Sequence, residues 1–208
     1  VTGVQTCALP IFRFSPYDDS LYITVASSLI KKGDFGSYLD HPLLKMEFFP
    51  IFLFIINYLK VDYVYFKSIG FSLGAIILAA GFYVRSGNIK LSTMVVLVLL
   101  LNPVIYSNEW ACLTREPLAV ILDLIILGLL INVKAINFKK YNILSIMILL
   151  LLFSFSIYVH EEDVLRYFIY VLVIVAFNKN LGKKIIALMI ASIIISLIFI
   201  NTYRAFVY

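Results

Sequence analysis

The chain has 208 residues, of which 62% are hydrophobic and only 14% are charged, and its mean hydropathy is strongly positive. Soluble domains are nearer half apolar and a quarter charged, so this composition excludes an ordinary soluble domain and indicates an integral membrane protein. The formal net charge of +5 does not indicate nucleic-acid binding, because eight of the 17 basic residues lie in loops of one membrane side that hold no acid.

Residues 1–11, VTGVQTCALPI, resemble the translation of a common sequencing-library adapter. We treat them as an artefact and leave them out of the fold interpretation. Cys7 lies in this stretch, so Cys112 is the remaining cysteine and no internal disulfide is expected. Residue 12 is then close to the first genuine residue, and the end of the chain just after an apolar run predicts truncation there as well.

Residues 15–33 are predicted to form an amphipathic helix that lies on a membrane surface. Ser15 can cap its start, Pro16 suits the first helical position, and Asp18 sits where a carboxylate can bond the free amide of the cap. Two lysines in the last turn and Gly33 are typical of a helix end. The apolar stripe of this helix consists of Leu21, Tyr22, Val25, Ala26, Leu29 and Ile30.

The next apolar stretch, residues 48–59, follows a turn-rich loop at 34–42. It is shorter than the roughly 20 residues that a spanning helix needs, and Pro50 lies in its first turn. We therefore predict an interfacial or re-entrant helix here.

Six candidate membrane spans follow, and some of them require tilt or shifted boundaries because they are short. They lie at residues 67–84, 91–107, 117–133, 142–159, 163–178 and 184–200. The predicted fold is thus an all-α, polytopic transmembrane bundle, with an outer loop carrying juxtamembrane helices at 12–66 and a truncated helical domain at 67–208.

In this topology the acidic residues of the loops all lie on one side of the membrane. The loops after the first, third and fifth spans, with their edges, hold only basic residues: Arg85, Lys90, Lys134, Lys139, Lys140, Lys179, Lys183 and Lys184. The opposite side holds Asp18, Asp19, Asp34, Asp40, Glu47, Asp62, Glu109, Glu116, Glu161, Glu162 and Asp163. Basic loops face the cytoplasm, so we predict a plasma (inner) membrane protein whose acidic loops face outside. Asp123 is the acid that lies inside a span.

Five short patterns occur in a particular order on the acidic side. They are DDSLY at 18–22, FPIFL at 49–53, Asn102-Pro103, LTREP at 113–117 and HEED at 160–163. Together they resemble the outer loops of GT-C glycosyltransferases that use polyprenyl-phosphate sugars, such as protein O-mannosyltransferases and bacterial aminoarabinose transferases. The resemblance covers about residues 12–178. The chain differs from the family in having Glu rather than the commoner Asp as second acid, and in lacking the usual Arg in the 160–163 turn.

The resemblance implies transfer of a sugar from a polyprenyl-phosphate carrier to a lipid, protein or glycan acceptor at the outer face. A carboxylate at the membrane edge can deprotonate the attacking hydroxyl, which suggests Asp18 as base with Asp19 and Glu116 orienting the substrates. Guanidinium groups suit the oxygens of the leaving phosphate. The expected substrate-binding residues are Arg13, Tyr22, Arg115, His160 and Glu161. No cofactor is required, although the acids could hold a divalent cation.

Each candidate also has a structural alternative. Asp18, Asp19 and Glu116 could simply satisfy helix N-termini, and Arg115 could be an interfacial anchor. Residues 160–163 could be a solvated turn. Asp123 is a functional candidate as an intramembrane acid, or it could pair with a neighbouring helix. The alternative function is a polysaccharide polymerase or a lipid-linked sugar transporter, and a truncated product without activity is a third. The sequence has no phosphate-cradling glycine loop, paired-cysteine metal site or His-Glu-x-x-His motif, which argues against soluble nucleotide chemistry.

Overall fold

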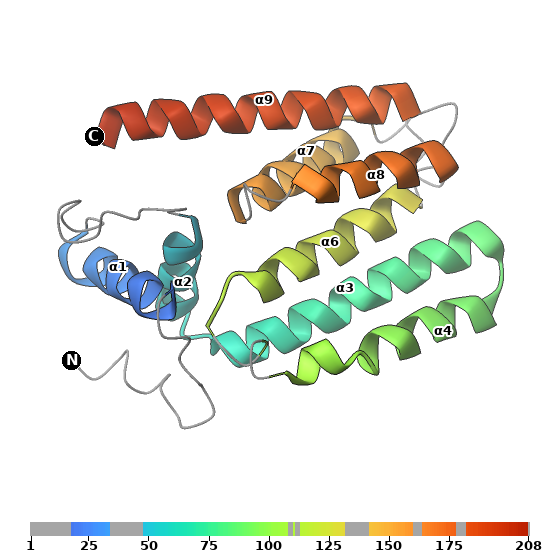
Figure 1. Cartoon of the computed structure of the whole chain (residues 1–208), viewed down its shortest axis with the longest axis horizontal. Coiled ribbons are helices and arrows are strands. Elements are labelled where there is room, and N and C mark those ends of the chain that lie inside the picture. Colours follow the sequence, from blue (N-terminus) through green and yellow to red (C-terminus); the bar gives the residue numbers. More distant parts are fainter. Residues whose placement is uncertain are drawn as a thin grey trace. The chain divides into compact units, whose positions relative to one another are not determined.

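The computed structural model of the chain describes residues 18–33, 48–107, 110, 113–131, 142–159, 164–177 and 182–207. Within these residues the regular structure is entirely helical, which confirms the all-α prediction (Figure 1). The helices are α1 (Asp18–Lys32), α2 (Phe48–Tyr58), α3 (Tyr63–Ser86), α4 (Ile89–Leu100), the 3-10 helix η2 (Pro103–Tyr106), α6 (Glu116–Ile131), α7 (Asn142–Val159), α8 (Val164–Phe177) and α9 (Gly182–Val207).

Two stretches of the described residues are long and apolar enough to cross a membrane by length and composition. They are Tyr63–Ser86 and Ile89–Tyr106. The described parts of α2, α7 and α9 contribute shorter apolar helices. Among the described residues, two stretches meet both criteria, whereas the sequence predicts six spans.

The ends of several helices follow from local sequence. Gly33 has a φ of +77°, which favours glycine, and its amide donates to the carbonyl of Leu29 at 3.1 Å to close α1. Gly87, with a φ of +67°, closes α3 in the same way through the carbonyl of Tyr83 at 2.7 Å. The sequence therefore located the end of α1 correctly, because the signal lies in one residue.

The span predicted at residues 91–107 is helical in two pieces, α4 and η2. Pro103 lacks an amide hydrogen and restricts the residue before it, so the α-helix cannot continue through this position. Asn102 takes an extended conformation, and its side chain accepts the amide of Val104 at 3.0 Å to cap η2. The Asn-Pro pair is thus a helix break within the predicted span.

The chain divides into two compact units. The first unit contains Val1–Gly70 and Leu100–Leu118, and the second contains Phe71–Leu99 and Ala119–Tyr208. The first unit therefore joins the opening helices to a segment that follows them much later in the sequence.

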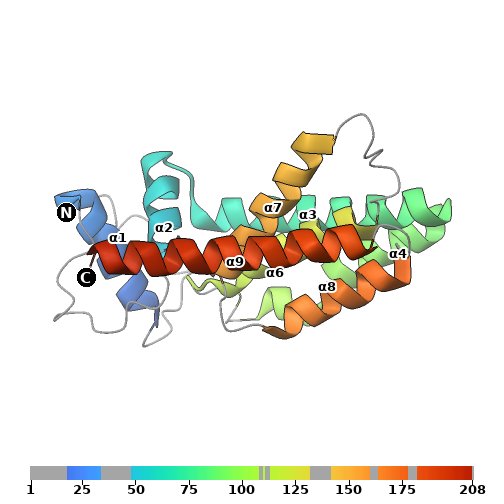
Figure 2. The ribbon, with the colours of Figure 1, turned by 90° about the horizontal axis from the view of Figure 1, so that it is seen from above.

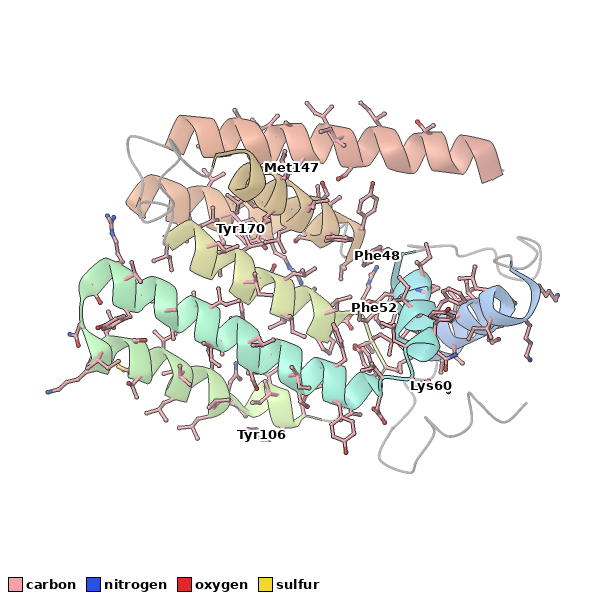
Figure 3. The ribbon with its side chains drawn as sticks, turned by 180° about the vertical axis from the view of Figure 1, so that it is seen from behind. Phe48, Phe52, Lys60, Tyr106, Met147 and Tyr170 are labelled. Carbon is pink, nitrogen blue, oxygen red and sulfur yellow. The ribbon has the colours of Figure 1, made fainter. Side chains whose placement is uncertain are left out.

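Aromatic rings form the core of the first unit, where α1 packs against α2 (Figure 1). The ring of Phe49 is fully buried, with edge contacts to Tyr22 at 5.0 Å and Tyr63 at 6.2 Å between centroids. Phe52, labelled in Figure 3, meets Phe66 edge-on at 5.0 Å. Because Tyr63 and Phe66 belong to α3, these rings join α1 and α2 to the first turns of that helix.

The second unit contains an unusually close crossing of α3 and α6. A Cβ atom added to Gly81 would lie 2.6 Å from the carbonyl oxygen of Gly128, and one added to Gly128 would lie 2.7 Å from the backbone of Ile77 and Leu78. Glycine is thus required on both helices for the backbones to meet. Such small-residue contacts are typical of helix packing in membranes, where apolar burial alone gives little preference for one partner.

Helices α6, α7, α8 and α9 of the second unit enclose a hydrophobic cluster. It consists of Ile126, Leu130, Leu149, Phe153, Tyr170 and Met189, from α6, α7, α8 and α9. Helix α9 packs against both α7 and α8, which diverge to opposite sides of α9 in the view of Figure 2.

Candidate functional site

The predicted acids stand at the starts of two helices, α1 and α6, and all three positions belong to the first unit. Asp18 and Asp19 open α1, and Glu116 opens α6 with an exposed side chain. The side chains of both aspartates lie outside the described structure. All three acids fall in the same compact unit, although nearly a hundred residues separate Asp18 from Glu116 in sequence. Their catalytic roles stay predictions.

Three of the other candidates, Arg13, His160 and Glu161, lie outside the described residues. Tyr22 is 5% exposed and packs against Phe49 in the aromatic core, so its described contacts are those of a core residue. Its part in substrate binding stays a prediction.

Arg115 immediately precedes α6, beside Glu116. Its side chain is half-buried, and its Nη1 atom is buried with no hydrogen-bond partner among the described residues. A buried guanidinium nitrogen without a partner, next to the positive end of a helix dipole, can donate a hydrogen bond to an anionic oxygen such as that of a phosphate.

The backbone that leads into Arg115 is held by two side chains of α3. The Tyr63 hydroxyl donates to the carbonyl oxygen of Thr114 at 2.7 Å, and the Lys67 ammonium donates to the carbonyl oxygen of Trp110. Tyr63 and Lys67 are one helical turn apart, so both project from one face of α3. We call this pair the α3 latch.

Lys67 is only 3% exposed, and its ammonium lies 5.2 Å from the centre of the Tyr63 ring. The negative face of an aromatic ring and a carbonyl oxygen both offset part of the free energy lost when an ammonium leaves water. From the sequence, residue 67 was predicted only as the edge of a span, and its buried contacts were not predicted. A lysine within an apolar helix was the available signal, because such a residue needs a buried partner.

A second polar cluster lies inside the second unit, between α6 and α8. The Tyr170 hydroxyl donates to Oδ1 of Asp123, and Nε of Arg166 lies 3.4 Å from Oδ2 of the same carboxylate. Figure 3 labels Tyr170 among the side chains between these helices. Of the two interpretations of Asp123, the structure shows pairing with a neighbouring helix. The ion pair is neutral overall and joins two helices.

Within the described residues, no group of three or more His, Cys, Asp and Glu side chains could hold a metal ion. A cation held by Asp18 or Asp19 lies outside this test, because their side chains are not described.

Comparison with protein-family models, curated proteins and solved structures found no match to this chain. The resemblance to GT-C glycosyltransferases therefore rests on the sequence patterns alone.

Proposed function

We propose that the chain is part of a membrane glycosyltransferase that transfers a sugar from a polyprenyl-phosphate carrier to an acceptor at the outer membrane face. One observation carries the proposal furthest: the helix that opens at Asp18 and the segment that holds Arg115 and Glu116 belong to one compact unit. A base and a phosphate-binding group are needed close together for this reaction.

The proposed topology has six membrane spans, formed by α3, α4, α6, α7, α8 and α9. The placement of all the loop acids on one side supports it, as do the two stretches long enough to span. In this topology Asp18, Asp19 and Glu116 lie at the outer face.

In the proposed reaction the acceptor oxygen attacks the anomeric carbon of the sugar. The bond between that carbon and the phosphate oxygen breaks, and the hydroxyl proton passes to the carboxylate of Asp18. Arg115 stabilises the negative charge that develops on the departing polyprenyl phosphate. Asp19 and Glu116 orient the acceptor or donor.

The transporter alternative depends on a charged group within the spans. The intramembrane acid Asp123 is paired with Arg166 and bonded by Tyr170, an arrangement that accounts for it structurally. This observation favours the transferase over the transporter.

The test compares Asp18→Asn with wild type in membranes that contain the product of the intact reading frame. Membranes are incubated with polyprenyl phosphates carrying radiolabelled mannose, glucose or aminoarabinose, and label leaving the carrier is followed. We expect a loss of transfer of about 100-fold or more, within the range typical of a catalytic base. Binding of a photoreactive polyprenyl phosphate should remain.

Asp62→Asn provides the matched control. Asp62 also precedes a helix on the predicted acidic side, and its Oδ1 accepts the amide of Val64 at 2.7 Å, a cap that asparagine keeps. Unchanged turnover in Asp18→Asn would overturn the catalytic assignment. A wild-type protein that transfers none of the three sugars would overturn the proposed function for these donors.

A further inference from the structure

We propose that the α3 latch, Tyr63 with Lys67, is a positioning device that fixes Arg115 and Glu116 for the transfer reaction. The inference rests on the proposed function and adds two residues that do not contact substrate themselves. It starts from the contacts of these residues with the backbone at Thr114 and Trp110.

The Thr114 contact acts directly on Arg115. The carbonyl of Thr114 and the amide of Arg115 belong to one planar peptide unit, so a bond to that carbonyl orients the whole unit. A hydrogen bond of 2.7 Å from a ring that is itself buried in the aromatic core leaves little freedom for this plane. Tyr63 therefore restrains the peptide plane from which Arg115 departs.

The Lys67 contact holds the same segment four residues earlier in the chain. Trp110 is held at its carbonyl by Lys67, and its amide also donates to the Ser107 hydroxyl at 3.2 Å. The carbonyls of Trp110 and Thr114 are thus both bound to α3. Burying the Lys67 ammonium costs free energy of hydration that an apolar side chain at the same position would not lose. The hydrogen bond to the Trp110 carbonyl explains why a charged residue stands there.

The latch is built on a rigid element. Tyr63 and Lys67 belong to the first turns of a long helix, and Phe49 and Phe52 pack against the ring of Tyr63. A site held by side chains whose own positions are fixed by packing keeps its geometry better than one held by a loop. A displacement of about 1 Å at reacting groups can slow a reaction about 100-fold.

The experiment uses the product of the intact reading frame, reconstituted in lipid vesicles, with the variants Tyr63→Phe, Lys67→Met and Lys67→Arg. Hydrogen–deuterium exchange of a peptide covering residues 110–116 measures the latch without reference to any activity. Turnover of a radiolabelled polyprenyl-phosphate sugar, resolved into kcat and KM, measures its effect on the reaction. Tyr65→Phe and Lys90→Met are the matched controls, because both side chains are exposed.

We expect exchange of the 110–116 peptide to rise about tenfold in Tyr63→Phe, as for the loss of one hydrogen bond, and more in Lys67→Met. In the same variants kcat should fall about 10- to 100-fold with KM nearly unchanged. Lys67→Arg, which keeps the charge and the donors, should recover part of kcat. The double variant should lose less than the product of the two single effects, because both residues act on one segment.

Unchanged exchange in Tyr63→Phe and Lys67→Met would show that the latch does not hold the segment, and it would overturn the inference. Faster exchange with unchanged kcat would overturn the positioning role while leaving the proposed transferase intact. A wild-type protein that turns over no donor would remove the proposed function and the positioning role with it. The exchange result would then still decide whether the two contacts hold the backbone.

Discussion

The two units of the molecule use their polar residues in opposite ways. In the first unit, Tyr63 and Lys67 bond to backbone carbonyls, and the side chain of Glu116 stays exposed. In the second unit, the charged groups Asp123 and Arg166 pair with each other between two helices. The first arrangement leaves the side chain of Glu116 exposed, whereas the second uses charged side chains to join helices.

The apolar contacts of the units differ as well. Aromatic edges fill the core of the first unit, where large rings meet across α1, α2 and α3. Backbone contact at Gly81 and Gly128 brings α3 and α6 together in the second unit. Side chains larger than glycine do not fit where α3 and α6 cross, so substitutions at this crossing should lower stability the most.

The largest effect is expected for Gly128→Leu. A Cβ atom at this position would lie 2.7 Å from the backbone of Ile77 and Leu78, which cannot move aside as a side chain could. We expect α3 and α6 to separate, lowering the free energy of unfolding by about 3 kcal/mol or more. Unfolding in mixed micelles with increasing SDS measures the change.

Ala80→Leu is the control for this substitution, because Ala80 lies on α3 with an exposed side chain. Its free energy of unfolding should stay within about 0.5 kcal/mol of wild type. Equal stability of Gly128→Leu and Ala80→Leu would contradict the close crossing.

A smaller effect is expected for Asp123→Asn. Asparagine keeps the shape and can accept the Tyr170 hydroxyl, but it removes the negative charge opposite Arg166. We expect the free energy of unfolding to fall by about 2 kcal/mol, as for the loss of a charged hydrogen-bond partner. The same SDS titration checks it.

Asp62→Asn tests the corresponding change in the first unit, and it should leave stability nearly unchanged because asparagine caps helices as well as aspartate. If Asp123→Asn and Asp62→Asn had the same free energy of unfolding, the ion pair of Asp123 would contribute no more to stability than the helix cap of Asp62, and the contrast between the two units would be contradicted.

The smallest effect is expected for Ser92→Ala in the second unit. The Ser92 hydroxyl is buried and donates to the carbonyl of Ala79 at 2.8 Å, which joins α4 to α3. Because that carbonyl already belongs to a helix, we expect a loss of only about 0.6 to 1 kcal/mol. Thermal unfolding in detergent measures it against Thr93→Val, which removes an exposed hydroxyl from the next residue. A larger loss in Thr93→Val would refute the assignment.

Local sequence signals predicted the helices well. Residues 142–159 were predicted as a membrane span and form α7 with the same bounds, because polar residues in the sequence flank this apolar run. The predicted helix at 48–59 ends one residue early, at Tyr58. The break at Asn102-Pro103 was visible as a motif, but the hydropathy of 91–107 concealed its effect on the helix.

The contacts that build the candidate site were much harder to predict. Lys67 and Trp110 are 43 residues apart, and Tyr63 and Thr114 are 51 residues apart. Neither pair belongs to a periodic pattern, and a backbone carbonyl carries no mark in the sequence that identifies it as an acceptor. Asp123 was predicted to be an intramembrane acid, but its partner on α8 could not be chosen among the available cations.

The sequence by itself determined the helices and most of their ends, because these depend on neighbouring residues and on hydrophobicity. The tertiary structure alone decided that Asp123 pairs with Arg166, that two glycines meet between α3 and α6, and that Tyr63 and Lys67 hold the segment before Arg115. Those choices depend on which helix faces meet, and that is fixed by packing many side chains at once.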